Sequence, residues 1–200
     1  MLNRLVTPVG TAILLVDRNA DHARAMKAAL SDQGFGLAGV ISDPTGIPDG
    51  VAATEARVII VNADKVDGPL VSALEKIPAA ARRPTVLFCA DASTEAINAA
   101  IDAGVHAYVL EGAGADRLRA AIDLAEANFR TISRLTGERD EARDALKARK
   151  IIERAKGLIM KEKGLDEEQA YRLLRSHAMQ KGQRLIDIAT TITEAAEVMK

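Results

Sequence analysis

The first half of the chain alternates short apolar runs with stretches in which apolar residues recur every three or four positions. The runs are rich in aliphatic and β-branched residues, a pattern typical of strands that are buried on both faces. We expect strands at 11–17, 36–42, 57–61, 84–90 and 107–110. The stretches between them predict helices at 21–34, 69–77, 93–104 and 115–129. This alternation indicates an α/β fold with a doubly wound, five-stranded parallel sheet and right-handed crossovers.

Residues at the ends of these stretches mark where the helices start and stop. Gly34 follows the first helical stretch, where a glycine can adopt the left-handed conformation that closes a helix. Pro69 stands near the first turn of the second stretch, a position that needs no backbone N–H. Ser93 precedes the third stretch and is a favoured N-cap residue. These signals support the helix limits given above.

From residue 115 onward the chain has no proline and no strand-like run, which favours a continuous helical region. Gly137 is a candidate break in the helix that begins there. Near the start of this helix, apolar residues alternate at spacings of four and three, as in a coiled-coil seam: Leu118, Ile122, Ala125, Phe129 and Ile132. The seam is explained either by a homodimer through this segment or by packing of the helix on its own domain.

Three amphipathic helical stretches follow, at 151–163, 166–179 and 183–199. The first ends at Gly164, and the second opens with Asp166 and Gln169, which are spaced as a capping box. We expect the three apolar stripes to pack on one another as a small bundle. The predicted organisation is a front α/β domain at 8–127, a helical connector with coiled-coil character at 128–140 and an all-α three-helix domain at 141–200.

The composition is that of an intracellular globular protein. Apolar residues make up 48% of the chain, with only two Tyr and three Phe, so the core is expected to be aliphatic. The single cysteine, Cys89, allows neither a disulfide framework nor a zinc site. No apolar run reaches the ~18 residues of a membrane helix, and the apolar part of the N-terminus is too short for a secretory signal. We expect a soluble, cytoplasmic protein with no membrane partner.

The net charge of −1 hides a difference between the two halves. Residues 1–129 hold 11 Lys and Arg against 16 Asp and Glu, whereas residues 130–200 hold 16 against 12. Within 147–184 the balance is 11 basic to five acidic residues. A basic back half indicates either a polyanionic partner or a solvated helical surface with paired charges, and charge alone does not separate the two.

The front domain resembles the CheY-like receiver domains over roughly 120 residues. In that family an acidic pair after the first strand binds Mg²⁺, and an aspartate after the third strand accepts a phosphoryl group. Here Asp17 remains, Arg18 replaces the second acid and Asn62 stands at the acceptor position. Because a neutral amide is a far poorer nucleophile than a carboxylate, the resemblance implies a pseudo-receiver.

Three further positions of the receiver pattern can be compared with the family. Ala90 stands where receivers carry the sensing hydroxyl, and Glu111 stands where they carry the lysine. The aromatic residue of the fifth strand is kept, as Tyr108. We expect Arg18 to occupy the former Mg²⁺ space as an internal ion pair with Asp17, with Glu111 nearby. Asp64, two residues beyond Asn62, is the one carboxylate that could substitute as acceptor.

The alternative interpretation of the front domain is an α/β enzyme, because open sheets place ligands at the carboxyl ends of their strands. No glycine-rich phosphate-binding motif follows any expected strand. His22 and His106 are isolated in the sequence and are better explained as surface or packing residues. We therefore expect no enzymatic activity, no catalytic residue, no metal and no cofactor.

The stretch from 151 to 189 closely resembles the ANTAR domain, the RNA-binding antiterminator module of the AmiR and NasR regulators. The matching residues are distributed over three helices and two turns, which makes them far more specific than a short motif. They are Ala155-Lys156-Gly157, Leu158-Ile159-Met160, Gly164, Glu168, Ala170-Tyr171, Leu174-Arg175, Ala178-Met179 and Arg184-Leu185.

This resemblance implies a target in leader mRNA, namely two small hairpins whose binding prevents a terminator from forming. Lys and Arg suit such a target, because they neutralise phosphate and Arg can also stack on or hydrogen-bond an exposed base. We expect RNA contacts from Lys156, Arg175 and Arg184. A supporting field of positive charge is expected from Arg149, Lys150, Arg154, Arg172 and Lys181.

Other residues of the matching stretch are expected to pack rather than bind. Ala155, Ala170 and Ala178 are small enough to bring helices together, and Met160 and Met179 are expected in the core. Since position 160 is a methionine, no acid four residues after Lys156 neutralises that lysine. We therefore expect the Lys156 charge to be available to RNA.

The whole chain resembles the nitrate-responsive antiterminators of the NasT type, especially in the stretches "AYVLEG" and "ERAKGLIMK". The resemblance implies control by a cytoplasmic nitrate/nitrite sensor protein related to solute-binding proteins. The loss of the phosphate site agrees, since another differential binding event must then shift the equilibrium. Three alternatives stay open: a DNA-binding response regulator, a phosphorylation-dependent one and a flavodoxin-like domain that binds a small molecule.

Overall fold

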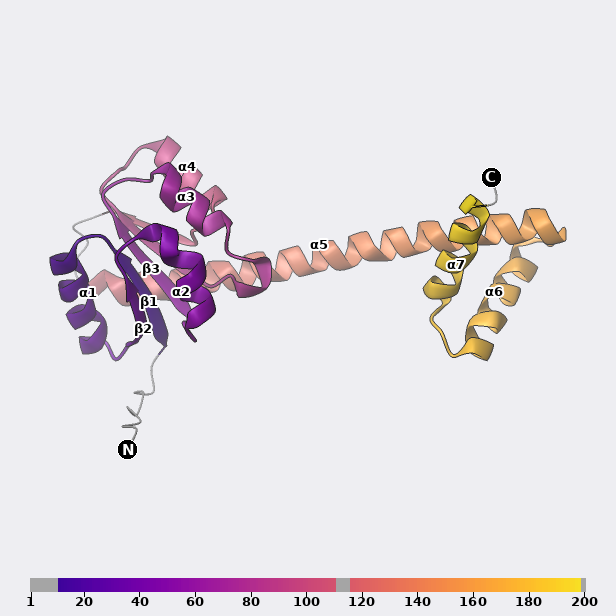
Figure 1. Cartoon of the computed structure of the whole chain (residues 1–200), viewed down its shortest axis with the longest axis horizontal. Coiled ribbons are helices and arrows are strands. Elements are labelled where there is room, and N and C mark those ends of the chain that lie inside the picture. The colour runs from indigo at the N-terminus through magenta and orange to yellow at the C-terminus, as the bar shows by residue number, and fades with distance from the viewer. Residues whose placement is uncertain (1–10, 111–115, 199–200) are drawn as a thin grey trace, which may run out of the picture. The chain divides into compact units, whose positions relative to one another are not determined.

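The structure, a computed structural model, describes residues 11–110 and 116–198 (Figure 1). The chain divides into two compact units, which meet between Ser133 and Arg134. We call these the first unit and the second unit. Among the described residues, no helix combines the length and the apolar character that crossing a bilayer requires.

The first unit contains the expected five-stranded parallel sheet, with strand order β2-β1-β3-β4-β5 (Figure 1). The strands are β1 (Ala12–Asp17), β2 (Gly36–Ile41), β3 (Val58–Ala63), β4 (Thr85–Cys89) and β5 (Ala107–Leu110). β1 and β3 pair in a register that sets Asp17 opposite Asn62 at their carboxyl ends. The fold prediction is therefore confirmed, and two of the predicted site residues lie side by side.

Helices cover both faces of this sheet. They are α1 (Ala20–Asp32), α2 (Ile47–Ala53), α3 (Gly68–Glu75), α4 (Thr94–Asp102) and α5 (Asp116–Lys163), with short 3₁₀ turns η1 (Pro44–Gly46) and η2 (Ala79–Ala81). Alternate residues along β1 point to opposite faces, as the strand geometry requires. One face packs Ile13 and Leu15 against α1 and α5, and the other packs Leu14 and Val16 against α2, α3 and α4. Cys89 is fully buried in the second of these two cores.

The expected helix caps are present in the first unit. The Ser93 hydroxyl accepts a hydrogen bond from the Ala96 N–H at the start of α4, and Gly34 adopts a φ of 81° after α1. The helix α2 has only seven residues and includes Pro48 and Gly50. So short a helix with a proline and a glycine shows no apolar stripe, which is why the pattern of the sequence does not predict it.

Helix α5 is continuous from Asp116 to Lys163, so the expectation of a break at Gly137 is wrong. Gly137 keeps the ordinary negative φ of a helix, and a Cβ at this position would meet open space. A glycine in an exposed helix costs only about 1 kcal/mol relative to alanine, which the surrounding helix-forming residues can offset. The side chains from 130 to 147 are all exposed.

The second unit contains the end of α5 together with α6 (Glu167–Lys181) and α7 (Leu185–Val198). Its core is small and rich in alanine: Ala155, Ile159, Ala170, Leu174, Ala178, Ile188 and Ala189. The Asp166 and Gln169 capping box is complete, since each side chain accepts a hydrogen bond from the backbone N–H of the other. Gly164 and Gly182 have φ of 64° and 62° and provide the two turns. The buried alanines agree with the predicted packing role.

Candidate functional site

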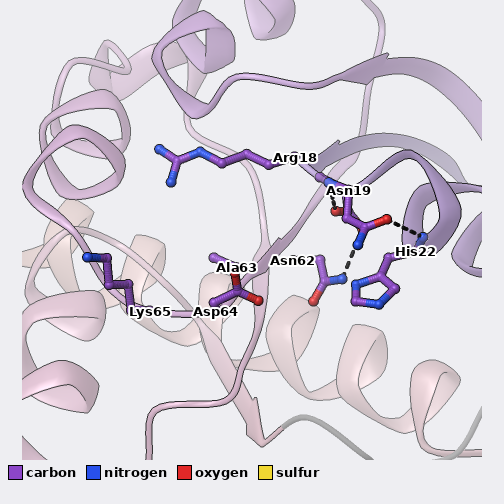
Figure 2. A pocket seen from close by; sticks show the side chains of 8 residues that line it. Arg18, Asn19, His22, Asn62, Ala63, Asp64 and Lys65 are labelled. Carbon is purple, nitrogen blue, oxygen red and sulfur yellow. Dashed lines mark hydrogen bonds between the residues drawn. The ribbon is translucent and has the colours of Figure 1, made fainter.

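The carboxyl ends of β1 and β3 form the first candidate site. Asp17 is only 4% exposed, and both of its oxygens accept hydrogen bonds. Oδ2 accepts from the Asn62 amide at 2.9 Å, and Oδ1 accepts from the Asn19 N–H at 2.8 Å. The Asn62 side chain therefore partners the buried carboxylate instead of standing free as a group that could be modified (Figure 2).

Arg18 does not form the predicted internal ion pair with Asp17. Its guanidinium extends away from Asn62 and lies 2.9 Å from Asp67 Oδ2, with half of the Arg18 side chain exposed (Figure 2). The reason lies in α3, where Asp67 is the N-cap and its Oδ1 accepts from the Leu70 N–H. That backbone hydrogen bond, with Arg18 beside it, holds the pKa of Asp67 below its ordinary value, so a full negative charge attracts Arg18.

A cavity of about 330 Å³ opens at this edge of the sheet (Figure 2). Its lining includes Asp17, Asn62, Asp64 and Lys65. The donor set is a poor fit to Mg²⁺, because the buried carboxylate already accepts two N–H groups and Lys65 adds a positive charge. Asp64 is exposed, and the described residues contribute no hydrogen bond or ion pair to its side chain.

The other positions of the receiver pattern lie beyond β4 and β5. Ala90 is exposed just after β4 and offers no hydroxyl. Tyr108 is partly buried on β5, and its hydroxyl donates to the Asp91 carbonyl at 2.6 Å. Burial, followed by hydrogen bonding with Cys89, raises the pKa of Tyr108 above its ordinary value. Glu111 lies outside the described residues.

The second candidate site is the positive surface of the second unit, and Lys156 differs from expectation there. Its side chain is only 8% exposed, and its Nζ lies 2.8 Å from Glu153 Oε2 and 2.7 Å from Glu167 Oε1. No acid stands four residues after Lys156, yet the lysine is neutralised, because its partners come from three residues earlier and from the first turn of α6. Hydrogen bonds to these two glutamates raise the pKa of Lys156. Lys156 therefore ties α5 to α6.

Two of the expected arginines have acidic partners three or four residues away in the sequence. Arg184 makes a double contact with Asp187 at 2.8 and 3.0 Å, and Arg172 lies 3.5 Å from Glu168. Both arginines are exposed, so these pairs are weak and can exchange for other anions. Arg149, Lys150, Arg154, Arg175 and Lys181 are exposed as well.

Arg175 differs from Lys156 and Arg184, because no described residue forms an ion pair or hydrogen bond with its guanidinium. On α6 it lies four residues after Tyr171 and four before Met179, a spacing that aligns all three on one helical face. Tyr171 is 40% exposed and Met179 is 72% exposed. The placement of Met179 in the core is therefore wrong, whereas Met160 does pack against the core. We call Tyr171, Arg175 and Met179 the α6 row.

The apolar stripe of α6 explains why sequence patterns misplace Met179. Ala170, Leu174 and Ala178 already form the buried line of this helix, and residue 179 lies about 100° further around it. An exposed methionine beside an arginine and a tyrosine offers a flexible apolar contact that a core residue would not. The α6 row is the feature of this surface that residue types alone do not reveal.

Comparison with solved structures supports the α/β fold of the first unit. The signal receiver domain of a candidate Luxo repressor from Vibrio parahaemolyticus superposes with a TM-score of 0.53 at 16% identity, covering 64% of this chain and 98% of that one. A DNA-binding response regulator of the LuxR family from Staphylococcus aureus gives 0.52 at 15% identity, covering 58% and 98%. At these identities the likeness concerns the fold, which is CheY-like.

Residues 140–192 match the family model described as the ANTAR domain. The second unit is thus an ANTAR domain, and the chain combines it with a receiver-like fold. The chain thus joins a region that matches the ANTAR domain to a CheY-like fold.

Two regulatory proteins are similar to this chain over different lengths. The transcriptional regulatory protein PdtaR of Mycobacterium tuberculosis is 26% identical over 187 residues, which cover 94% of this chain and 88% of that protein. The nitrate regulatory protein of Klebsiella oxytoca is 43% identical over 61 residues, which cover 30% of this chain and 15% of that protein. The first likeness extends over both units.

Proposed function

We propose that this protein is a transcription antiterminator whose second unit binds paired hairpins in leader RNA and thereby prevents a terminator from forming. The observation that carries the proposal is the ANTAR domain at 140–192, which presents exposed positive side chains around a small helical core. Lys and Arg on such a surface suit the phosphates and splayed bases of RNA loops.

The α6 row is the centre of the proposed RNA surface. Arg175 has no partner among the described residues, so binding RNA would not require an existing ion pair to break. Tyr171 and Met179 beside it offer surfaces on which an unpaired base can lie. Arg184 and Arg172 would contribute after leaving their acids, and Lys156 would act by holding α5 and α6 together.

A surrounding field of positive charge would strengthen phosphate contacts. The exposed members of this field are Arg149, Lys150, Arg154 and Lys181. We assign RNA binding to residues 141–200, the connector to 128–140 and the control of binding to 8–127. A homodimer through α5 would present two such surfaces, one for each hairpin.

Control by a protein partner, and not by phosphorylation, accounts for the first unit. Asn62 occupies the place of the acceptor and is hydrogen-bonded to Asp17, which leaves no nucleophilic carboxylate at that position. The likeness of the second unit to a nitrate regulatory protein supports a nitrate/nitrite sensor protein of the solute-binding type as the partner, in the cytoplasm. Such a partner would hold the regulator inactive until its ligand appears.

RNA binding is tested with the full-length protein by gel shift at moderate salt. The probes are a leader transcript with two hairpins, a scrambled transcript of equal length and a promoter duplex. We expect preference for the paired hairpins. Equal binding of the scrambled transcript would contradict the proposal, and preference for the duplex would favour a DNA-binding response regulator.

Partner control is tested by pull-down from lysate with and without nitrate, with the captured protein identified by mass. We expect a solute-binding-type protein that is released by nitrate. Treatment with acetyl phosphate or beryllofluoride and Mg²⁺ is the opposing test. A Mg²⁺-dependent response that is lost in Asp64→Asn would contradict our assignment and favour phosphorylation.

A further inference from the structure

A second cavity of the first unit lies at the opposite edge of the sheet from Asp17 and Asn62. It measures about 470 Å³ and is bordered by Arg57, Arg82, Arg83 and Arg130 together with one acid, Glu126. Arg57 immediately precedes β3, and Arg83 lies two residues before β4, so the amino ends of these strands position both. We call this cavity the arginine pocket.

The excess of positive charge here runs against the charge of the surrounding chain. Residues 1–129 hold 11 basic residues against 16 acidic ones, yet the arginine pocket gathers four guanidinium groups around a single carboxylate. Within the part of the chain that the structure describes, Arg57, Arg82 and Arg130 form no ion pair. Arg57, Arg82 and Arg130 are exposed, so an anion in the pocket would gain charge-assisted contacts without first breaking an ion pair.

The pocket is built on rigid parts of the first unit. Arg83 donates from Nε to the Ala56 carbonyl at 3.2 Å and from Nη1 to the Arg82 carbonyl at 2.9 Å, which fixes its side chain. On the α5 side, Phe129 packs edge-on against His106 with ring centroids 5.1 Å apart, and Asn128 donates to the His106 carbonyl. The wall that carries Arg130 is therefore attached to β5.

The remaining lining is apolar and limits the kind of ligand that fits. Ala79, Ala80, Pro84 and Phe129 form this part of the pocket. A concave site of this size with a few convergent charges is typical of small-molecule sites. A long nucleic acid is disfavoured as the ligand, because residues 1–129 as a whole carry more acidic than basic side chains.

We propose that the arginine pocket binds a small phosphorylated ligand with several negative charges, of the nucleoside polyphosphate class. The planar forks of the guanidinium groups match phosphate oxygens in pairs, and the apolar wall suits a base or a sugar. Because Glu126, Phe129 and Arg130 belong to α5, the ligand would tie this helix to the amino ends of β3 and β4. The first unit would thus have an input separate from its carboxyl edge.

Three histidines make a site-resolved test available in the intact protein. His106 is next to the arginine pocket, His22 lines the cavity at the carboxyl edge, and His177 is exposed on α6 in the second unit. Burial and then the nearby Arg82 charge lower the pKa of His106. An anion at Arg82 would offset the second of these causes, so it would raise the pKa of His106.

The experiment titrates tag-free, ¹⁵N-histidine-labelled full-length protein with inorganic triphosphate and with ATP. We expect saturable NMR shifts of His106, with its pKa rising, while His22 and His177 stay unchanged. Tighter binding of ATP than of triphosphate would support the proposal, because the apolar wall then contacts the base or the sugar. Equal binding would overturn the assignment to the nucleoside class.

Variants show whether the arginines are responsible. Arg57→Ala and Arg130→Ala should each weaken binding about tenfold, because each removes a charge-assisted contact. Arg24→Ala removes an exposed arginine of the same unit that pairs only with Asp21, and should bind normally. Absence of saturable His106 shifts, unchanged binding by both pocket variants, or the same His106 response to hairpin RNA would each overturn the proposal.

Discussion

The two units treat their polar side chains in opposite ways. At the carboxyl edge of the sheet, Asp17 is bound by Asn62, and Arg18 is bound by Asp67. On α6, Arg175 has no such partner among the described residues, and Tyr171 and Met179 beside it are exposed. The polar groups at the carboxyl edge of the sheet are paired within the first unit, whereas the α6 row keeps exposed groups without a partner among the described residues.

The first unit shows that a CheY-like sheet can be complete while an amide, and not a carboxylate, stands at the end of β3. The receiver-like sheet has its strand order, register and helix caps in place, yet its buried carboxylate, Asp17, accepts a hydrogen bond from the neutral amide of Asn62. A signal can still reach such a unit, provided that it arrives as a bound partner or ligand with different affinity for two states.

The largest effect is expected on the α6 row. Arg175→Ala should lower affinity for the paired hairpins about ten- to hundredfold, or about 1–3 kcal/mol by analogy with base readout in DNA. Fluorescence anisotropy with labelled RNA at several salt concentrations measures it. Arg24→Ala in the first unit is the matched control and should bind normally. Equal affinity of both variants would remove Arg175 from the RNA surface.

Replacing Asn62 tests how strongly the carboxyl edge is satisfied. Asn62→Leu should cost about 1–3 kcal/mol of unfolding free energy, since Asp17 loses a donor while it stays buried. Asn62→Asp should cost a similar amount at pH 7 through like-charge repulsion. Urea unfolding monitored by Tyr108 fluorescence in a Tyr171→Phe background reports on the first unit.

The two Asn62 variants are separated by pH. In Asn62→Asp, repulsion raises the folded pKa of one carboxyl above its unfolded value. Stability is then complete below the unfolded pKa and is lost as pH rises through the folded one. We expect acidification to restore Asn62→Asp and not Asn62→Leu. Equal recovery of both would show that Asp17 and Asn62 are not coupled, and the exposed Asp64→Asn change should have little effect at any pH.

A smaller effect is expected where Arg18 meets Asp67. Asp67→Ala removes the N-cap of α3 and should cost about 1 kcal/mol, while Arg18→Ala removes a half-exposed ion pair and should cost well under that. The folded pKa of Asp67 is lowered, so its contribution is present above the unfolded pKa and is lost as pH falls through the folded one. Urea titrations at pH 7 and below measure the unfolding free energy of both variants. A larger loss for Arg18→Ala than for Asp67→Ala would show that the ion pair, and not the N-cap, is the main contribution of Asp67.

The smallest effect concerns His106. Its NMR titration should give a midpoint below the ordinary 6.5, because burial and Arg82 both disfavour the charged ring. With the folded pKa depressed, stability falls as pH drops from the unfolded pKa towards the folded one. Arg82→Ala should move the midpoint upward by a fraction of a unit. A midpoint that does not change would remove Arg82 from the field at His106.

Much of the fold could be predicted from the sequence because strands and helices obey different periodicities. The five buried strands, the Ser93 cap and the Asp166–Gln169 capping box all follow from local patterns. The short α2 and the unbroken passage of α5 through Gly137 do not, because proline, glycine and helix propensity are weak guides where neighbours decide.

The site was harder to predict, because charge pairing depends on contacts between distant residues. Glu153, three residues before Lys156, follows a helical spacing rule, but the second partner of Lys156 and the partner of Arg18 lie 11 and 49 positions away, at Glu167 and Asp67. No spacing rule on a single helix detects these two pairs. The arginine pocket likewise joins residues from η2, α5 and the starts of two strands, which only the folded chain brings together.

The single cysteine gives the sheet a built-in probe of how often β4 opens. Cys89 lies in the central part of the first unit with no exposed surface, so a thiol reagent can reach it only when β4 opens. The rate at which the Cys89 thiol is labelled would then measure how often that strand opens, without any added probe. A ligand that binds the folded first unit and stabilises β4 would slow this labelling.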